Sequence, residues 1–583
     1  ESLNANQSFE DYYSQLFDRG LYEILNRVDP LRVVYIQPEV QALAKVNKVP
    51  FFSFLDRPLT CDDYFFIVYK AQKNLKKLTA RLSEVAQIKD VKHFEKWSED
   101  FDGYLNQPNI WPTDNAQQTQ LLRALFAHAY IEASENEDNE KARYRLAKRL
   151  FFRRFVDMQI KDESEVASMI LKSAVATMDA HSRFFSAEEY REAIRSLMST
   201  FVGIGIVVAE VDEGYKILEL IDGGPAKSED ILSAGDVILQ VGDVSIAGER
   251  RETLSSLLSG PDGSKVKLTV RSQDEVREVT VTRGPVRTSS STIHYGLKPV
   301  GKKVLGHIKL DHFYTDDNGG GAYVDFAAAV QTLTQQGAQG LIIDLRDNGG
   351  GVLSEVIEIA GLFIPSGPIV FEYGTLKSGL SVYEDEDGKT LYNGPLAVLV
   401  NENSASAAEI LAGALKTYRR AVVVGTDQTY GKGTIQEIGP VQNIWPDSPI
   451  DGGVKLTVGY YYLPNGTSVQ FEGVKPHIVV GKHKRDAELE RSLPMALKRP
   501  DDIGLEFKPF NAWLSDKQFS NLLSYVSADH RAEEFLPEKP QIKESIDDKP
   551  LHKAYKTLAG MVDYYRVYLP GLVAAQMSDN LTQ

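Results

Sequence analysis

The chain has 583 residues, 43% of them hydrophobic, with a formal net charge of −16 and a single cysteine. At roughly 150 residues per domain, this length predicts about four globular units with sizeable cores, and the acidic balance argues against a nucleic-acid partner. No apolar run approaches the ~20 residues that a membrane-spanning helix needs, and the lone Cys61 excludes an intrachain disulfide and a cysteine-based metal site.

Residues 1–198 are predicted to form a helical N-terminal domain. Aromatic and aliphatic side chains recur there at helical spacing, as in Leu121–Phe126. The basic cluster Lys148–Arg154 is interpreted as one solvated helix face. His181 stands alone in a turn, where a structural role is more frequent than a catalytic one, and both roles stay open.

Short strands and turns alternate over residues 199–287, interrupted by two short helices near Pro225–Leu232 and Arg251–Leu258. This pattern resembles a PDZ domain, which binds an extended peptide as an added strand and captures its free carboxylate on backbone N–H groups of a glycine loop. A bare Gly-x-Gly also occurs in turns and nucleotide loops, but no third glycine follows at the spacing of a dinucleotide fingerprint. The expected loop and pocket residues are Val202, Gly203, Ile204, Gly205, Leu254, Leu257 and Leu258.

Strands alternate with helices over residues 293–482, which predicts right-handed βαβ units and a mostly parallel sheet. One apolar run, Leu396–Val400, precedes Ser406, and a helical pattern follows this serine. A second apolar run leads into the glycines at 349–351 and then into another helix. Because parallel strands end at one edge of a sheet, we expect Ser406 and these glycines at the same edge.

The small residues around Ser406 are typical of a serine nucleophile at a helix start, where unpaired backbone N–H groups can stabilise an oxyanion. Lys432 lies between two glycines beside an apolar strand, and a buried lysine with a lowered pKa can take the serine proton. The glycine run offers a second backbone donor. Noncatalytic alternatives stay open: close packing or an N-cap for Ser406, and a solvated turn for Lys432. A phosphate-binding loop is disfavoured, because the spacing from Gly425 to Lys432 departs from the Walker pattern.

Further motifs join this set: Asp179-Ala180-His181-Ser182, Tyr462-Leu463-Pro464-Asn465-Gly466 and Gly473-Val474-Lys475-Pro476. Together, over most of the chain, these residues resemble the C-terminal processing peptidases, most closely the tail-specific protease branch. The resemblance implies a multidomain α+β chain. Its parts would be a helical N-terminal region, a PDZ domain, a mostly parallel βαβ serine protease core of the crotonase and ClpP type, and a helical C-terminal region over residues 483–583.

The resemblance also implies a role for each motif residue. Ser406 would be the nucleophile, Lys432 the general base, and Gln436 the partner that orients the lysine. Thr417 stands where some relatives carry an acidic residue, so no aspartate third member is expected. The oxyanion hole would consist of backbone N–H groups, with Gly351 the preferred glycine; its candidate residues are Gly350, Gly351 and Ala407.

We therefore expect an ATP-independent serine endopeptidase that recognises protein C-terminal tails through the PDZ domain and degrades or processes extracytoplasmic proteins. Its partners would be protein substrates with accessible C-terminal tails, with or without an adaptor protein, and no cofactor or metal is expected. The resemblance points to the periplasm, with a signal segment removed. Two alternatives stay open: a noncatalytic PDZ scaffold that binds tails on an inert protease fold, and an enzyme of the same fold that acts on small acyl esters.

Overall fold

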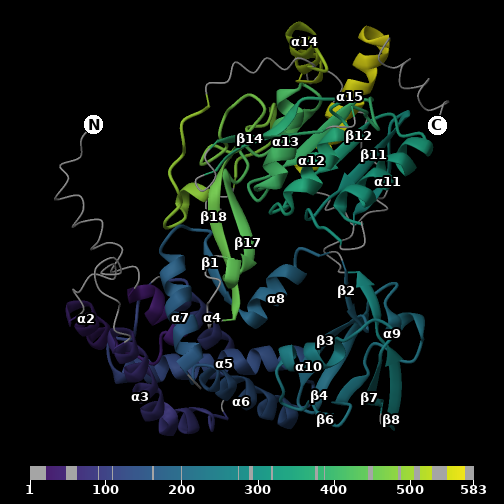
Figure 1. Ribbon diagram of the computed structural model, residues 1–583. Helices are drawn as coiled ribbons and strands as arrows, with labels where there is room; N and C mark the ends of the chain where they lie inside the picture. The colour runs from purple at the N-terminus through teal and green to yellow at the C-terminus, as the bar shows by residue number, and fades with distance from the viewer. Residues whose placement is uncertain are drawn as a thin grey trace. The chain divides into compact units, whose positions relative to one another are not determined.

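In the computed structural model the chain forms two compact units, each held together by contacts among its own residues (Figure 1). The first contains residues 1–188, 202–286 and 440–454, and the second contains residues 189–201, 287–439 and 455–583. No helix in the part of the chain that the structure describes is both long and apolar enough to cross a membrane. The structure describes residues 21–46, 62–89, 91–107, 109–160, 163–198, 200–273, 275–287, 293–316, 320–374, 379–385, 388–443, 451–483, 488–503, 512–527 and 548–570.

The first unit begins with helices whose apolar faces share one core. Helix α5 starts at an Asp114 cap, whose carboxylate accepts two first-turn N–H groups, and α6 starts at an Asn139 cap of the same kind. Phe126 packs edge to face against Phe94 and Phe151, with ring centres 5.9 and 5.4 Å apart. The elements are α2 (Gln37–Val46), α3 (Asp62–Val85), α4 (Phe94–Leu105), α5 (Asn115–Asn136), α6 (Glu140–Val156), α7 (Glu163–Ala176) and β1 (Arg183–Ser186). The next helix, α8 (Ala187–Arg195), belongs mostly to the second unit.

An antiparallel sheet in the order β3-β4-β5-β7-β8, with β6 paired to β5, completes the first unit. Strand β3 has a partner on one side only among the described residues, so it is an edge strand (Figure 1). Ile217, Ile238 and Leu268 of the sheet share a core with Leu254 and Leu258 of helix α10. The elements are β2 (Thr200–Gly203), β3 (Ile206–Val211), β4 (Gly214–Leu220), α9 (Pro225–Ser228), β5 (Val237–Val241), β6 (Val244–Ser245), α10 (Arg251–Leu258), β7 (Lys265–Ser272), β8 (Glu275–Thr282) and β9 (Gly284–Arg287).

The basic run on α6 is not one solvated face, so the interpretation of that pattern was wrong. Arg153 donates to both carboxylate oxygens of Glu210 at 2.6 and 2.7 Å, and Arg149 donates to Asp212 at 2.8 Å. These arginine side chains keep only 18% and 23% of their surface exposed. Because the pairs are partly buried and one of them is bidentate, they hold α6 against β3 and the turn that follows it.

The second unit is built on a six-stranded sheet in the order β10-β11-β12-β15-β16-β19. Strand β10 is antiparallel to β11, and all other neighbours are parallel, which confirms the predicted mostly parallel sheet. The strands are buried on both faces, because Ile343 packs against α11, α12 and α13 while the next-door Ile342 faces the opposite side. The elements are β10 (His294–Val300), β11 (Lys303–Lys309), α11 (Ala322–Gln335), β12 (Leu341–Asp344), α12 (Leu353–Gly361), β15 (Leu396–Val400), α13 (Ala407–Thr417), β16 (Val422–Gly425) and β19 (Ile478–Val479).

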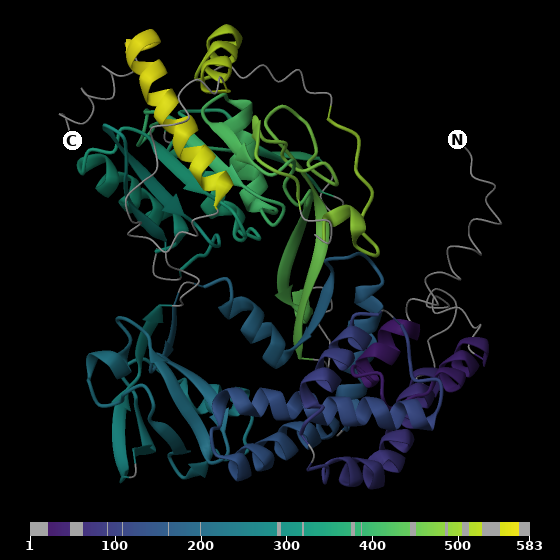
Figure 2. The ribbon, with the colours of Figure 1, turned by 180° about the vertical axis from the view of Figure 1, so that it is seen from behind.

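The opposite face of this sheet is covered by α15 (Lys549–Tyr568), with α14 (Asp516–Ser527) packed beside it. Figure 2 shows α15 lying across the strands. The contact is close, because a Cβ on Gly340 would lie 2.9 Å from Leu558 Cδ1 and 3.2 Å from Val562 Cγ2. The C-terminal helices therefore complete the second face of the core, rather than forming a core of their own.

A smaller antiparallel sheet also belongs to the second unit. Strand β13 pairs with β14 on one side and β18 on the other, and β17 pairs with β18. The strands are β13 (Pro368–Gly374), β14 (Leu380–Glu384), β17 (Thr434–Pro440) and β18 (Gly452–Tyr462). Strand β17 begins two residues after Lys432, the predicted base, and β18 carries Tyr461, whose hydroxyl donates to the Ser406 carbonyl. This sheet therefore contacts both parts of the predicted site.

Candidate active site

Ser406 lies at the turn from β15 into α13, as the apolar run and the helical pattern predict. Its backbone has φ 56° and ψ −117°, outside the regions that L-residues favour, and such strain persists only where the surroundings hold it. Ser404 Oγ donates to the Leu345 carbonyl at 2.8 Å, and Tyr461 Oη donates to the Ser406 carbonyl at 3.2 Å. With Ala405 only 7% exposed, the turn projects the Ser406 side chain from a fixed backbone.

Glu409, three residues after the serine, ties the two halves of the site together. Its fully buried carboxylate accepts the N–H groups of Ser406 and Lys432, each at 2.9 Å. The same carboxylate accepts the Gly431 N–H at 2.8 Å and the Thr429 hydroxyl at 2.5 Å. Burial raises the pKa of Glu409 to about 7, although these four hydrogen bonds act in the opposite direction. One side chain therefore fixes the serine turn against the lysine loop.

Lys432 meets its predicted partner. The half-buried Lys432 Nζ donates to Gln436 Oε1 at 2.5 Å and to the Thr434 carbonyl at 3.2 Å. The Gln436 amide in turn donates to the hydroxyls of Thr434 at 2.9 Å and Thr457 at 3.3 Å. With its oxygen toward Lys432 and its NH2 group toward the two threonine hydroxyls, Gln436 presents an acceptor to the lysine.

The glycine run leads from β12 toward α12 and lies directly against the serine. A Cβ on Gly350 would lie 2.8 Å from Ser406 Cβ. The Gly350 carbonyl accepts the Phe313 N–H at 3.0 Å and a ring N–H of His312. In a planar trans peptide the carbonyl of one residue and the N–H of the next point in opposite directions. The Gly351 N–H is therefore directed away from Phe313, and it donates to no other group among the described residues.

This geometry separates the three predicted oxyanion residues. The Gly350 N–H donates to Asn348 Oδ1 at 2.8 Å. The prediction that Gly350 is an oxyanion donor was therefore wrong. Gly350 instead lets the backbone pass close to Ser406. Its φ of 104° is one that glycine adopts readily and L-residues do not. Ala407 is the first residue of α13, and its N–H, like that of Gly351, has no partner within the described part of the chain. Gly351 and Ala407 thus remain the two candidate donors.

Sequence reasoning missed two residues of this site. Glu409 carried a signal, because Ser-x-x-Glu before an apolar run is the spacing of a capping box, in which the glutamate reaches back to the first N–H. His312 carried none. Its Nε2 is buried without a hydrogen-bond partner among the described residues, and burial lowers the pKa of the ring. A neutral His312 therefore supports the glycine run through the Gly350 carbonyl.

A buried ion-pair network lies behind the glycine run, at the end of β12. Asp344 accepts two hydrogen bonds from the Arg346 guanidinium at 2.9 and 2.6 Å and lies 3.2 Å from the His307 ring. Burial alone would raise the pKa of Asp344, but these partners hold it at about 2. Arg346 also pairs with Asp548, the cap of α15, at 2.6 Å. The network joins the C-terminal helix to the strand that precedes the glycines.

The predicted peptide-binding residues lie in the first unit. Ile204 is 2% exposed, and the Ile204 and Gly205 carbonyls accept the N–H groups of Ala226 and Ile221, which follow β4, each at 2.9 Å. Leu254 and Leu258 are 1% and 8% exposed and belong to the domain core, whereas Leu257 keeps partial exposure. Leu254 and Leu258 thus belong to the buried face of α10 and share a core with Ile204, while Val202 and Gly203 end strand β2.

Two other predictions concern residues outside this constellation. His181 follows Asp179, whose carboxylate accepts the His181 N–H at 2.8 Å in a local turn of the first unit. This contact holds the backbone of the turn and involves no atom of the His181 ring. Within the described residues, no cluster of three or more histidine, cysteine, aspartate or glutamate side chains has the arrangement of a metal site. Cys61 lies outside the described residues.

Known proteins resemble this chain in both parts. The model of peptidase family S41 matches residues 304–480, and that of the PDZ domain matches residues 202–282. A tail-specific protease of Haemophilus influenzae is 32% identical over 323 residues, which are 54% of this chain but only 45% of that protein. A carboxy-terminal-processing protease of Bartonella bacilliformis is 28% identical over 76% of this chain and 94% of its own length. A carboxyl-terminal-processing protease of Picosynechococcus is 30% identical over 62% of this chain and 83% of its own length.

Proposed function

Because this chain belongs to the carboxyl-terminal-processing proteases of peptidase family S41 and carries a PDZ domain, we propose that it is an ATP-independent serine endopeptidase acting through a Ser406–Lys432 dyad. The PDZ domain would bind the free C-terminal tail of a protein substrate as an added strand. The single observation that carries the proposal is the Glu409 carboxylate, which joins the strained Ser406 turn to the Lys432 loop.

In the first step, the neutral amine of Lys432 takes the Ser406 hydroxyl proton as the serine oxygen attacks the substrate carbonyl. Gln436 Oε1 accepts an N–H of the lysine and so aims its nitrogen. The developing oxyanion is held by the Gly351 and Ala407 N–H groups. Because both donors belong to backbone that is fixed before the reaction, little reorganisation is needed as the charge develops.

The remaining steps reuse the same groups. Protonated Lys432 gives its proton to the leaving amine, and the C–N bond breaks to leave an ester between Ser406 and the substrate. A water molecule then attacks this ester, and Lys432 takes the proton of the water. Collapse of the second tetrahedral intermediate returns the proton to Ser406 and releases a new carboxylate end.

The test is a small folded protein with a destabilised structure and an apolar C-terminal tail, compared with the same protein ending in two aspartates. We expect loss of the apolar-tailed protein only, no loss with Ser406→Ala, and no effect of a metal chelator. A chromogenic acyl ester in parallel separates a protease from a small-ester hydrolase. Equal loss of both tailed proteins, or undiminished cleavage by Ser406→Ala, would contradict the proposal.

The glycine run offers a matched pair of substitutions. Gly350→Ala places a methyl group 2.8 Å from Ser406 Cβ in a conformation that disfavours L-residues, so we expect kcat/KM to fall at least about a hundredfold, as when one oxyanion donor is lost. Gly349→Ala meets no atom within 4 Å and should change kcat/KM less than about threefold. Cleavage kinetics and thermal melting of both variants measure the difference. Equal activities would show that the run does not border the reaction.

The compartment and the partners belong to the same proposal. We place the protein in the periplasm, where it degrades or processes extracytoplasmic proteins, with or without an adaptor. The kinship with a tail-specific protease supports this placement. Cell fractionation with an antibody to the chain tests it, and recovery from the cytoplasm would contradict it.

A further inference from the structure

Strand β3 offers its open edge to a peptide, and one arginine already occupies that edge. Arg251, the first residue of α10, donates from Nη2 to the Val208 carbonyl at 3.1 Å. That carbonyl therefore points to the side where β3 has no neighbouring strand. Because backbone groups alternate along a strand, Ile206 and Glu210 present theirs on the same side as Val208.

The direction of a bound tail follows from these positions. A tail whose carboxylate is held at residues 202–205 pairs its last residue with Ile206 and runs antiparallel to β3, toward Val211. The residue four before the last then lies opposite Glu210, because Glu210 is four residues after Ile206. Upstream residues of the tail consequently approach the place where α5 and α6 meet the sheet.

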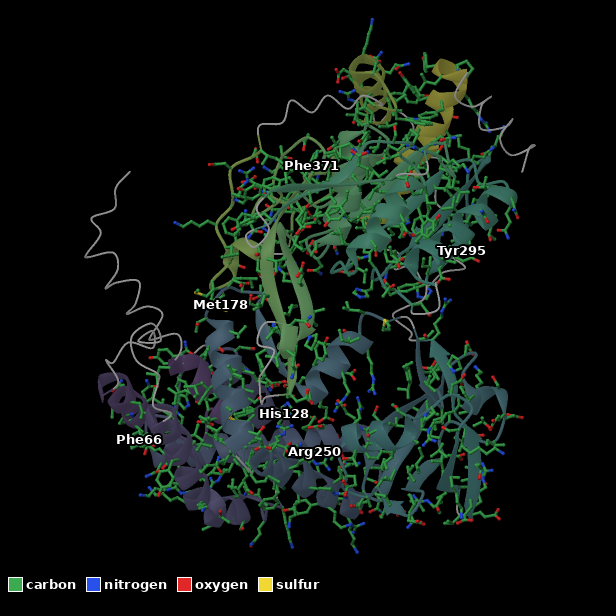
Figure 3. All side chains as sticks on the ribbon, in the orientation of Figure 1. Phe66, His128, Met178, Arg250, Tyr295 and Phe371 are labelled. Atoms are coloured by element: carbon green, nitrogen blue, oxygen red, sulfur yellow. The ribbon has the colours of Figure 1, made fainter. Side chains whose placement is uncertain are left out.

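A pocket of about 580 Å³ lies at that junction, lined by residues of α5, α6, β3 and α10. Figure 3 labels Arg250 there, between the helices and the sheet. The pocket therefore adjoins the open edge of β3, and one of its walls is made by the helices α5 and α6. Its charged lining consists of Glu132, Arg153, Arg154, Asp157, Glu210, Arg250 and Arg251.

The charges in this pocket do not cancel. Arg153 is bound by both oxygens of Glu210, Arg154 pairs with Glu132 at 2.7 Å, and Arg250 pairs with Asp157. Four guanidinium groups thus face three carboxylates. Among the described residues Arg251 has no acidic partner, and it donates to the Val208 carbonyl. The unmatched positive charge is therefore at the edge of β3 itself.

We propose that this pocket is a second recognition site for the substrate tail, and that it binds an acidic side chain about four residues before the terminal residue. The inference rests on the proposed function. When a tail adds to β3, the N–H of the residue two before its last, which lies opposite Val208, takes the Val208 carbonyl and displaces Arg251. The released guanidinium then lies beside the tail and pairs with the carboxylate of its acidic side chain. Arg251 thus binds the edge of β3 in the free protein and binds the acidic side chain of the tail in the complex.

The test uses the full chain with Ser406→Ala, so that bound tails are not cleaved. Two fluorescent peptides with the same apolar C-terminus differ only four residues before the last, where one has glutamate and the other lysine. We expect the glutamate peptide to bind about fivefold more tightly in fluorescence anisotropy, the scale of one partly exposed ion pair. Adding Arg251→Glu should reverse the preference. Lys265→Glu, an equal charge change on the exposed face of β7, should leave it unchanged.

The outcomes separate the inference from the function on which it rests. If both peptides bind equally and Arg251→Glu does not alter their ratio, the second recognition site is wrong while tail binding stands. If the preference follows Lys265→Glu as closely as Arg251→Glu, it reflects net charge and the pocket is wrong. If neither peptide binds and an amidated peptide behaves identically, the proposed tail recognition fails, and the pocket with it.

Discussion

Replacing Lys432 by alanine is expected to lower kcat/KM for a tail-bearing protein by about four orders of magnitude, as much as Ser406→Ala does. The two losses should not add in the double variant, because the nucleophile and its base act in one step. Lys432→Arg should be equally inactive, since a guanidinium does not give up its proton in a protein. Single-turnover cleavage followed by gel densitometry is sensitive enough to compare these rates.

The matched control is Lys475→Ala. Lys475 is an exposed lysine that pairs with Glu472 at 2.7 Å, so its loss should change the rate less than about twofold. Thermal melting of each variant must stay close to that of the native chain, because Lys432 makes its contacts at the end of its side chain. A Lys432→Ala protein that is folded and keeps more than a tenth of the native rate would remove the lysine from the mechanism.

Replacing Glu409 by alanine has the second large expected effect, and it acts on both stability and activity. The change leaves four buried donors without an acceptor: the N–H groups of Ser406, Gly431 and Lys432, and the Thr429 hydroxyl. Since each unsatisfied buried donor costs about 1–3 kcal/mol, we expect a loss of about 3–5 kcal/mol in the free energy of unfolding. Activity should be lost even well below the melting temperature, because Ser406 and Lys432 are no longer held together.

Glu409 also predicts a dependence of stability on pH. Its pKa is raised from 4.5 to about 7 by folding, so the folded chain binds the proton more strongly than the unfolded chain. The associated stability is fully present below pH 4.5 and is lost as the pH rises through 7, by about 3 kcal/mol in total. In Glu409→Gln this contribution cannot titrate. The difference in unfolding free energy between the native chain and Glu409→Gln should therefore shrink as the pH rises from 5 to 8.

The control for both experiments is Glu358→Ala, an exposed glutamate on the neighbouring helix α12. It should alter neither the melting curve nor the cleavage rate. Glu409→Ala with native stability and native activity would show that the carboxylate is dispensable. A native-minus-variant difference that stays constant from pH 5 to 8 would show that Glu409 keeps its charge throughout.

The repeating patterns in the sequence predicted the local frame of the site. The apolar run before Ser406 and the helical spacing after it predict a strand-to-helix turn, and the structure has that turn between β15 and α13. The alternation of strands and helices likewise predicts the parallel sheet that brings the glycine run to the same edge. The family comparisons confirm the fold class, which rests on such local periodicities.

Contacts between distant segments could not be predicted in the same way. Glu409 looks like an ordinary residue of a helix start until its partners Gly431 and Lys432 are known, 22 and 23 residues further along. Arg153 looks like part of a solvated face until β3 supplies Glu210, 57 residues away. The amphipathic pattern of α15 predicts that one of its faces is buried, but it does not predict that this face packs on the second face of the sheet.

Chemical restoration of the amine at position 432 is the decisive test of Lys432 as the general base. The chain with Cys61→Ser and Lys432→Cys is treated with 2-bromoethylamine, which forms a C–S bond, releases bromide and yields a lysine analogue with a more acidic ammonium group. We expect no cleavage before treatment, cleavage after it, and an acid limb of the pH–rate profile that lies at lower pH than in the native protein. Complete modification by mass spectrometry without any return of cleavage, or cleavage already present before treatment, would show that the amine at position 432 is not the general base.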